Sequence, residues 1–80
     1  AIFPNPNQGT FSIEIYSPVP ETVNILVLNM MGKYVFEDKN VSIKDRFSET
    51  INLSNLPDGL YLVQVQSVNG NCSKTIMIQR

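Results

Sequence analysis

The chain has 80 residues, which leaves room for one compact domain and no second core. Its 42% hydrophobic and 16% charged residues are typical of a folded domain rather than a disordered tail. Six basic and seven acidic residues give a net charge of −1, which argues against binding to nucleic acid or to an anionic membrane surface. No run approaches the roughly 18 apolar residues of a membrane span, so we expect no direct membrane insertion.

The residue types needed for most site chemistry are missing. Histidine is absent and Cys72 is the single cysteine, which excludes Ser-His and Cys-His nucleophile pairs, the usual metal clusters and an internal disulfide. Because Cys72 stands just before an apolar run, we expect it to be a buried or half-buried small side chain without a role. No pair of carboxylates has a spacing that suggests acid–base work; they are Glu14, Glu37, Asp38, Asp45, Glu49 and Asp58. We therefore expect no enzymatic activity, no metal and no cofactor.

The first third of the chain predicts two strands. Apolar and polar residues alternate from Thr10 to Ile15, which is the period of a strand with one buried face. Two prolines within Ser17–Pro20 predict a loop, because proline lacks the amide donor that a sheet ladder needs. The nearly continuous apolar run Val23–Leu28 is typical of a central strand buried on both faces.

The middle of the chain predicts a hairpin followed by a polar stretch. Asn29–Lys33 contains a glycine suited to a positive φ angle, and Tyr34–Phe36 follows it as a returning strand. The polar segment Glu37–Arg46 holds Val41 and Ile43, which could form a short edge strand.

The last third predicts three strands. An alternating segment Phe47–Leu53 leads into the turn Ser54–Gly59, and Tyr61–Gln66 alternates again after it. Asn69-Gly70 is a hairpin signal, and Lys74–Gln79 supplies the final strand. Short strands separated by turns, with no helical period, predict an all-β fold: an immunoglobulin-like antiparallel β-sandwich of about six or seven short strands, with residues 1–80 as one domain.

Two segments have a turn chemistry more specific than the rest. In FPNPNQGTF, Pro4 and Pro6 stiffen the entry to the first strand and Gly9 frees the final bend. Taken alone, this segment is explained as well by simple punctuation of the chain. In LPDGLYLVQV, Gly59 precedes Tyr61, so the phenol can donate a hydrogen bond back to the turn, as in the tyrosine corner of immunoglobulin-like sandwiches.

The final strand is bracketed by the basic residues Lys74 and Arg80. They could protect a sheet edge from pairing with other chains, or they could serve as a basic recognition handle. The residues alone do not decide between these two roles.

Taken in order, FPNPNQG, VNILVLNMMGKYV, INLSNLPDGLYLVQV and a basic residue before the terminal TIMIQR make the chain resemble the C-terminal sorting domain of type IX secretion substrates. The pattern of that family has an aromatic-Pro-Asn-Pro opening, a glycine after an apolar strand, a Leu-Pro-x-Gly-x-Tyr turn and a lysine-flanked apolar last strand. Two departures are small: Phe3 replaces the commoner tyrosine, and Asn29 stands where an aspartate is frequent.

The resemblance implies a domain at the C-terminus of a secreted protein of Gram-negative bacteria. Such a domain follows the cargo domain, reaches the periplasm with it, and is recognised by the type IX translocon in the outer membrane. A cell-surface sortase then typically removes it upstream of Ala1 and joins the cargo to lipopolysaccharide, so the cargo ends secreted or at the cell surface. The positions that match the family motifs are Pro4, Pro6, Gly9, Gly32, Gly59, Tyr61, Lys74 and Arg80.

The competing interpretation is an immunoglobulin-like adhesion or carbohydrate-binding module that shares this turn chemistry. Such a module usually presents exposed aromatic side chains on one face or in its loops. Only Phe36, Tyr16 and Tyr34 are eligible, and tryptophan is absent.

Overall fold

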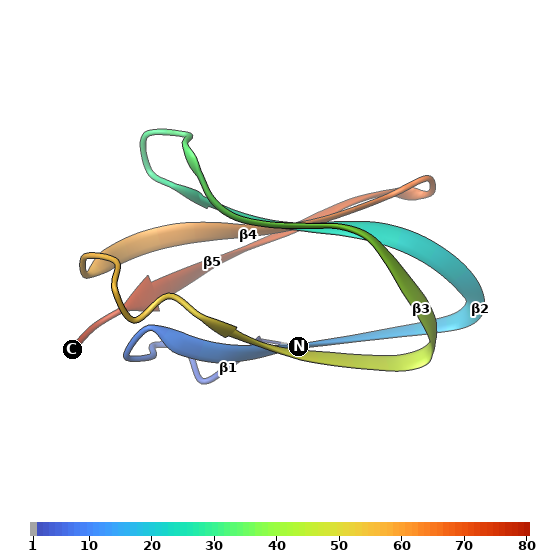
Figure 1. Ribbon diagram of the computed structural model, residues 1–80, viewed down its shortest axis with the longest axis horizontal. Coiled ribbons are helices and arrows are strands. Elements are labelled where there is room, and N and C mark those ends of the chain that lie inside the picture. The colour runs from blue at the N-terminus through green and yellow to red at the C-terminus, as the bar shows by residue number, and fades with distance from the viewer. Residues whose placement is uncertain (1) are drawn as a thin grey trace.

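The computed structural model describes residues 2–80, which form an all-β fold (Figure 1). Its strands are β1 (Ile2–Phe3), β2 (Thr10–Asn29), β3 (Tyr34–Asn52), β4 (Gly59–Ser67) and β5 (Gly70–Ile78). Every pair of neighbouring strands is antiparallel. Residues 2–80 include no helix that is long and apolar enough to cross a membrane.

Two long strands build both layers of the molecule. β2 and β3 pair along nearly their whole length and curve together at one end, so that each of them contributes to both layers (Figure 1). The second half of β2 lies between β3 and β4, and β5 extends this layer beyond β4. The first half of β2 pairs with β1 and with the end of β3 to form the other layer.

The predicted loop at Ser17–Pro20 is wrong, because β2 continues through it. The register between β2 and β3 shifts between Ser17 and Glu21, so the two prolines fall where the ladder is interrupted and no amide donor is needed. The three strands expected between Tyr34 and Leu53 likewise join into β3. Residues 2–80 therefore form five strands instead of six or seven, while the all-β antiparallel class is confirmed.

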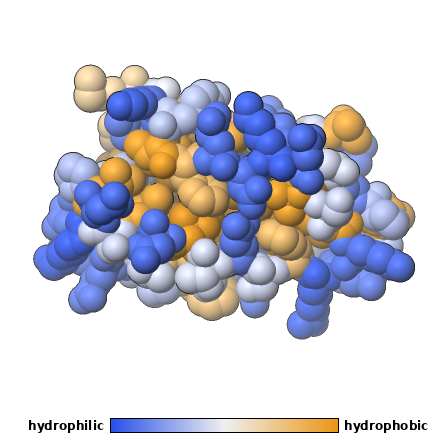
Figure 2. Space-filling view, in the orientation of Figure 1, coloured by the Kyte–Doolittle hydropathy of each residue, from blue (hydrophilic) through white to orange (hydrophobic). Residues whose placement is uncertain are grey.

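The core lies between the two layers and draws on all the long strands. Val23–Leu28 is a central strand as predicted: Ile25 and Val27 point into the core, and Leu26 is only 3% exposed on the opposite face. Phe36 packs against the core and is therefore not an exposed aromatic platform. Figure 2 shows hydrophobic residues gathered in a band between the layers, with hydrophilic residues above and below it.

The expected burial of Cys72 is wrong, since this residue is exposed. It has the same parity on β5 as Ile76 and Ile78, which are 0% and 1% exposed, so the period of two still directs it toward the interior face. Cys72 pairs with Val65 near the opposite end of β5, where the layers enclose a cavity instead of a closed core. Its exposure thus follows from its position along the strand.

Candidate recognition site at the chain ends

The opening loop, residues 4–9 between β1 and β2, pairs with the final strand β5 and covers part of its outer edge. The Asn7 amide donates to the Met77 carbonyl at 3.0 Å, and the Gln79 amide donates to the Asn7 carbonyl at 2.7 Å. The side chain of Asn5 adds two contacts: its Oδ1 accepts from the Met77 amide at 3.1 Å and its Nδ2 donates to the Thr75 carbonyl at 3.3 Å. The FPNPN motif therefore holds the last strand by a short parallel ladder.

The loop is shaped by the buried side chain of Asn7, which is 4% exposed. Its Oδ1 accepts from the Gly9 amide at 2.8 Å, and its Nδ2 donates to the Pro4 carbonyl at 3.2 Å. The peptide bonds that precede Pro4 and Pro6 are both cis. Because each buried polar group needs a partner, the two hydrogen bonds of the Asn7 side chain fix the loop in the shape that meets β5.

The side chain of Arg80 binds the turn that precedes β4. Its guanidinium donates to the carbonyls of Leu53, Ser54 and Leu56 at 3.2, 2.7 and 2.6 Å. It also forms an ion pair with Asp58, with 2.7 Å between Nη1 and Oδ1. We call these contacts the Arg80 clasp. The planar fork of arginine donors suits this arrangement better than the single ammonium of lysine would.

The clasp also changes the acidity of Asp58. The backbone amide of Arg80 donates to Oδ2 of Asp58 at 3.1 Å. This hydrogen bond is the main reason that the pKa of the Asp58 carboxyl lies below its ordinary value. The hydrogen bond from the guanidinium is the second reason. The carboxylate is therefore the form that holds the end of the chain.

Gly9 lies where the opening loop, the turn and the clasp come together. Its φ of +107° is one that other residues rarely adopt, and a Cβ here would lie 2.8 Å from both Ser54 Cα and Arg80 Nη2. The Gly9 carbonyl also accepts a hydrogen bond from the Leu53 amide at 2.6 Å. Glycine at this position is thus required by backbone conformation and by close approach.

The predicted tyrosine corner is confirmed. The hydroxyl of Tyr61 donates to the Pro57 carbonyl at 2.6 Å, and the ring is 5% exposed. This bond fixes the turn that carries Asp58. Gly59 begins β4 and pairs with Ile78, which connects the same turn to the last strand.

Two of the predicted positions lie away from the opening loop, the turn before β4 and the Arg80 clasp. Gly32 is in the turn between β2 and β3, where the side chain of Asn29 accepts from the amides of Met31 and Lys33 at 2.9 Å. Asn29 thus supplies the acceptor that an aspartate would supply. Lys74 is exposed on β5, opposite Val63.

Sequence reasoning missed three participants: Asn5, Asn7 and Asp58. What the sequence did not predict is that both asparagines contact β5 and that Asp58 pairs with Arg80. The available signals were weak: polar side chains within a proline-stiffened loop, and an acid in the turn with a complementary base at position 80. The contacts themselves span 70 and 22 residues, which no local pattern can indicate.

The exposed tyrosines and the remaining carboxylates do not form a second candidate site. Tyr16 and Tyr34 are 69% and 49% exposed, but Tyr16 lies near the bend of β2, whereas Tyr34 begins β3 beside the hairpin turn. Residues 2–80 hold no group of three or more potential metal ligands. Two acids do lie near each other: burial first, and then the neighbouring Asp38, raise the pKa of Glu49, whose Oε1 is buried without a hydrogen-bond partner among residues 2–80. This pair lies on β3 and is not part of the Arg80 clasp.

Comparison with known proteins identifies the family of the chain. A family model described as the secretion system C-terminal sorting domain matches residues 1–79, which include the opening loop, the tyrosine corner and all of β5. A search of curated proteins gave no match. The match spans nearly the whole chain, and the chain therefore belongs to the family of C-terminal sorting domains of type IX secretion.

Proposed function

We propose that the folded domain itself is the signal read by the type IX machinery, and that the surface of β5 is its main point of contact. Membership of the family establishes a sorting domain that acts with this secretion system and belongs to a secreted or surface-attached protein. The proposal that β5 is the point of contact is supported by the attachment of this strand to the body of the domain. Asn5 and Asn7 hold its edge, and the Arg80 clasp holds its end.

A strand held in this way can be recognised through its backbone. β5 pairs with β4 on one edge, while among residues 2–80 the opening loop contacts only the 75–79 portion of the other edge. The first half of β5 is thus open to pairing with a strand of the translocon. Backbone pairing gives affinity without a fixed side-chain code, which suits a signal shared by many cargoes.

The two basic residues then have different tasks. Lys74 is exposed, so its charge can orient a partner and speed association. The charge of Arg80 is already paired within the domain, so this residue acts by holding the strand in place. Of the two roles that the sequence left open, we thus assign recognition to Lys74 alone.

We further propose the route that goes with this role. The domain accompanies its cargo through the periplasm of a Gram-negative bacterium to the outer-membrane translocon, and a surface sortase removes it afterwards. It is a substrate in this reaction and carries no catalysis of its own. Its partners are then the translocon, the sortase and the preceding cargo domain.

An export assay tests the proposal. A periplasm-directed fluorescent reporter fused to residues 1–80 is expressed in a host with a working type IX system, and the reporter is measured in the medium, at the surface and in the periplasm. We expect the parent fusion to be exported, and both Lys74→Glu and a version lacking the last few residues to stay in the periplasm. Lys44→Glu is the matched control, because Lys44 is an exposed lysine on β3.

Folding of each variant is checked by circular dichroism and thermal unfolding, which separates loss of recognition from loss of structure. Export of the Lys74→Glu fusion at the parental level would show that this charge has no role in export. Export of the truncated fusion at that level would place the recognised surface elsewhere, most directly on the opening loop.

A further inference from the structure

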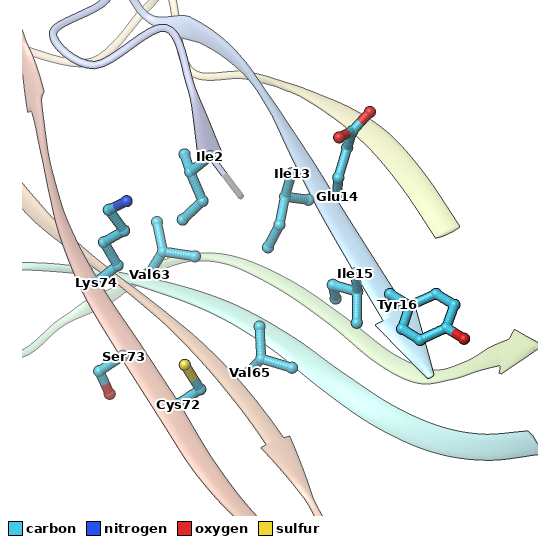
Figure 3. A pocket seen from close by; sticks show the side chains of 10 residues that line it. All are labelled: Ile2, Ile13, Glu14, Ile15, Tyr16, Val63, Val65, Cys72, Ser73 and Lys74. Atoms are coloured by element: carbon cyan, nitrogen blue, oxygen red, sulfur yellow. The ribbon is translucent and has the colours of Figure 1, made fainter. Parts of the chain in front are cut away.

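An apolar cavity of about 320 Å³ opens between the two layers beside Cys72 (Figure 3). It lies at the other end of β5 from the Arg80 clasp. Its apolar lining comes from both layers: Ile2, Ile13 and Ile15 from one, and Val63, Val65 and Cys72 from the other. The exposed Lys74 of β5 also lines it (Figure 3). This volume is far larger than the roughly 10–15 Å³ needed to hold one water molecule.

The core is closed beside Ile2 of β1 and open further along β2, toward Ile15. Ile2 pairs with Ile13, which is 2% exposed, and Val63 beneath it is 1% exposed. Two residues further along β2, Ile15 is only partly buried, and so is Val65 on the facing layer. The cavity is therefore the place where a longer β1 would complete the core.

The register of β1 decides which polypeptide would reach this place. β1 runs antiparallel to β2, with Ile2 opposite Ile13 and Phe3 opposite Ser12. A segment that continued β1 beyond Ile2 in the N-terminal direction would therefore run along β2 toward Ile15. With a period of two, the side chain two residues before Ile2 would face the cavity, as Ile2 itself does.

We propose that the cavity seats the polypeptide that precedes this domain in the exported protein, docked as a continuation of β1. The inference rests on the proposed function, because a C-terminal sorting domain follows a cargo. The docked segment has a defined pattern: small apolar side chains at alternate positions face Ile15, Val65 and Cys72, and polar side chains face solvent. Docking would place the connection to the cargo against the folded domain.

The thiol of Cys72 reports on this docking directly, because it is exposed and lines the cavity. We compare residues 1–80 with a longer chain that also carries about eight of the residues preceding them in the same gene. The measured quantity is the rate at which a neutral aromatic disulfide reacts with Cys72. A segment docked in about 90% of molecules slows this reaction about tenfold, because only the open form reacts.

A second reporter serves as the control. Val68 is 93% exposed in the turn between β4 and β5, so a cysteine placed there in a Cys72→Ser background should react at the same rate with and without the preceding residues. Val65→Arg, which places a charge in the cavity, should restore fast labelling of Cys72 in the longer chain. If that variant unfolds, the milder Ile15→Ser gives the same test.

Equal rates at Cys72 in the two chains, with no added amide-exchange protection at Ile15 and Tyr16, would overturn the proposal. These measurements need no secretion system. Failure of docking is therefore distinguishable from failure of the export assay.

Discussion

Gly9→Ala places a methyl group at the point where the opening loop, the turn and the Arg80 clasp meet. The new Cβ would lie 2.8 Å from the Ser54 Cα, a backbone atom that cannot move alone. It would lie equally close to Arg80 Nη2, which could be displaced only by breaking the clasp. The substitution therefore tests whether this close approach holds the chain ends together.

The expected loss of stability has two parts. Alanine at a φ of +107° costs about 1–3 kcal/mol in backbone strain. Relief of the contact with Ser54 requires a local backbone shift, which costs about another 1–3 kcal/mol. The sum of about 2–6 kcal/mol is a large share of the roughly 4–12 kcal/mol expected for a domain of this length.

Gly32→Ala is the matched control, because it carries the first cost without the second. Gly32 has a φ of +84°, and no atom lies within 4 Å of its ideal Cβ. Urea unfolding of both variants should show Gly9→Ala losing about 1–3 kcal/mol more than Gly32→Ala. Equal losses would refute the reasoning, since strain alone would then explain both.

Three further predictions concern single side chains. Tyr61→Phe removes the hydrogen bond to the turn and should lower the free energy of unfolding, measured by chemical denaturation, by about 1–2 kcal/mol. Tyr61→Ala should lower it by about 3–5 kcal/mol, because it also truncates a core side chain. A Tyr61→Phe variant as stable as the parent would contradict the tyrosine corner. Asp58 has a lowered pKa in the folded state, so its contribution to stability is present above its unfolded pKa and is lost as pH falls through the lowered value. Thermal melts between about pH 2 and 5 should therefore show a smaller acid loss for Asp58→Asn than for the parent, and identical pH curves would show that the contact with Arg80 contributes nothing. Glu49 has a raised pKa, so its contribution is present below its unfolded pKa and is lost as pH rises through the raised value. Glu49→Gln, which can donate to Asp38, should raise stability at neutral pH by about 1 kcal/mol, and a lower melting temperature there would count against the acid pair.

Structural features that depend on residues close together in the sequence could be predicted from the sequence alone. Alternation of apolar and polar residues predicted the strands around Phe11, Val63 and Ile76, because a strand turns every second side chain to the same face. The tyrosine corner was equally local, since Tyr61 and its acceptor are only four residues apart. The order of the turn motifs was sufficient to indicate the family.

Contacts between distant parts of the chain were decided only by the tertiary structure. Whether Ser17–Pro20 ended a strand depended on its partner strand, whose register shift removed the need for amide donors at the prolines. The roles of Asn7 and Arg80 depended on neighbours 70 and 27 residues away along the chain. Cys72 has the inward-facing parity of a buried residue, yet it is exposed because it lines the cavity between the layers instead of the closed core. The sequence determines which side chains can face inward, and the fold determines which of them are covered.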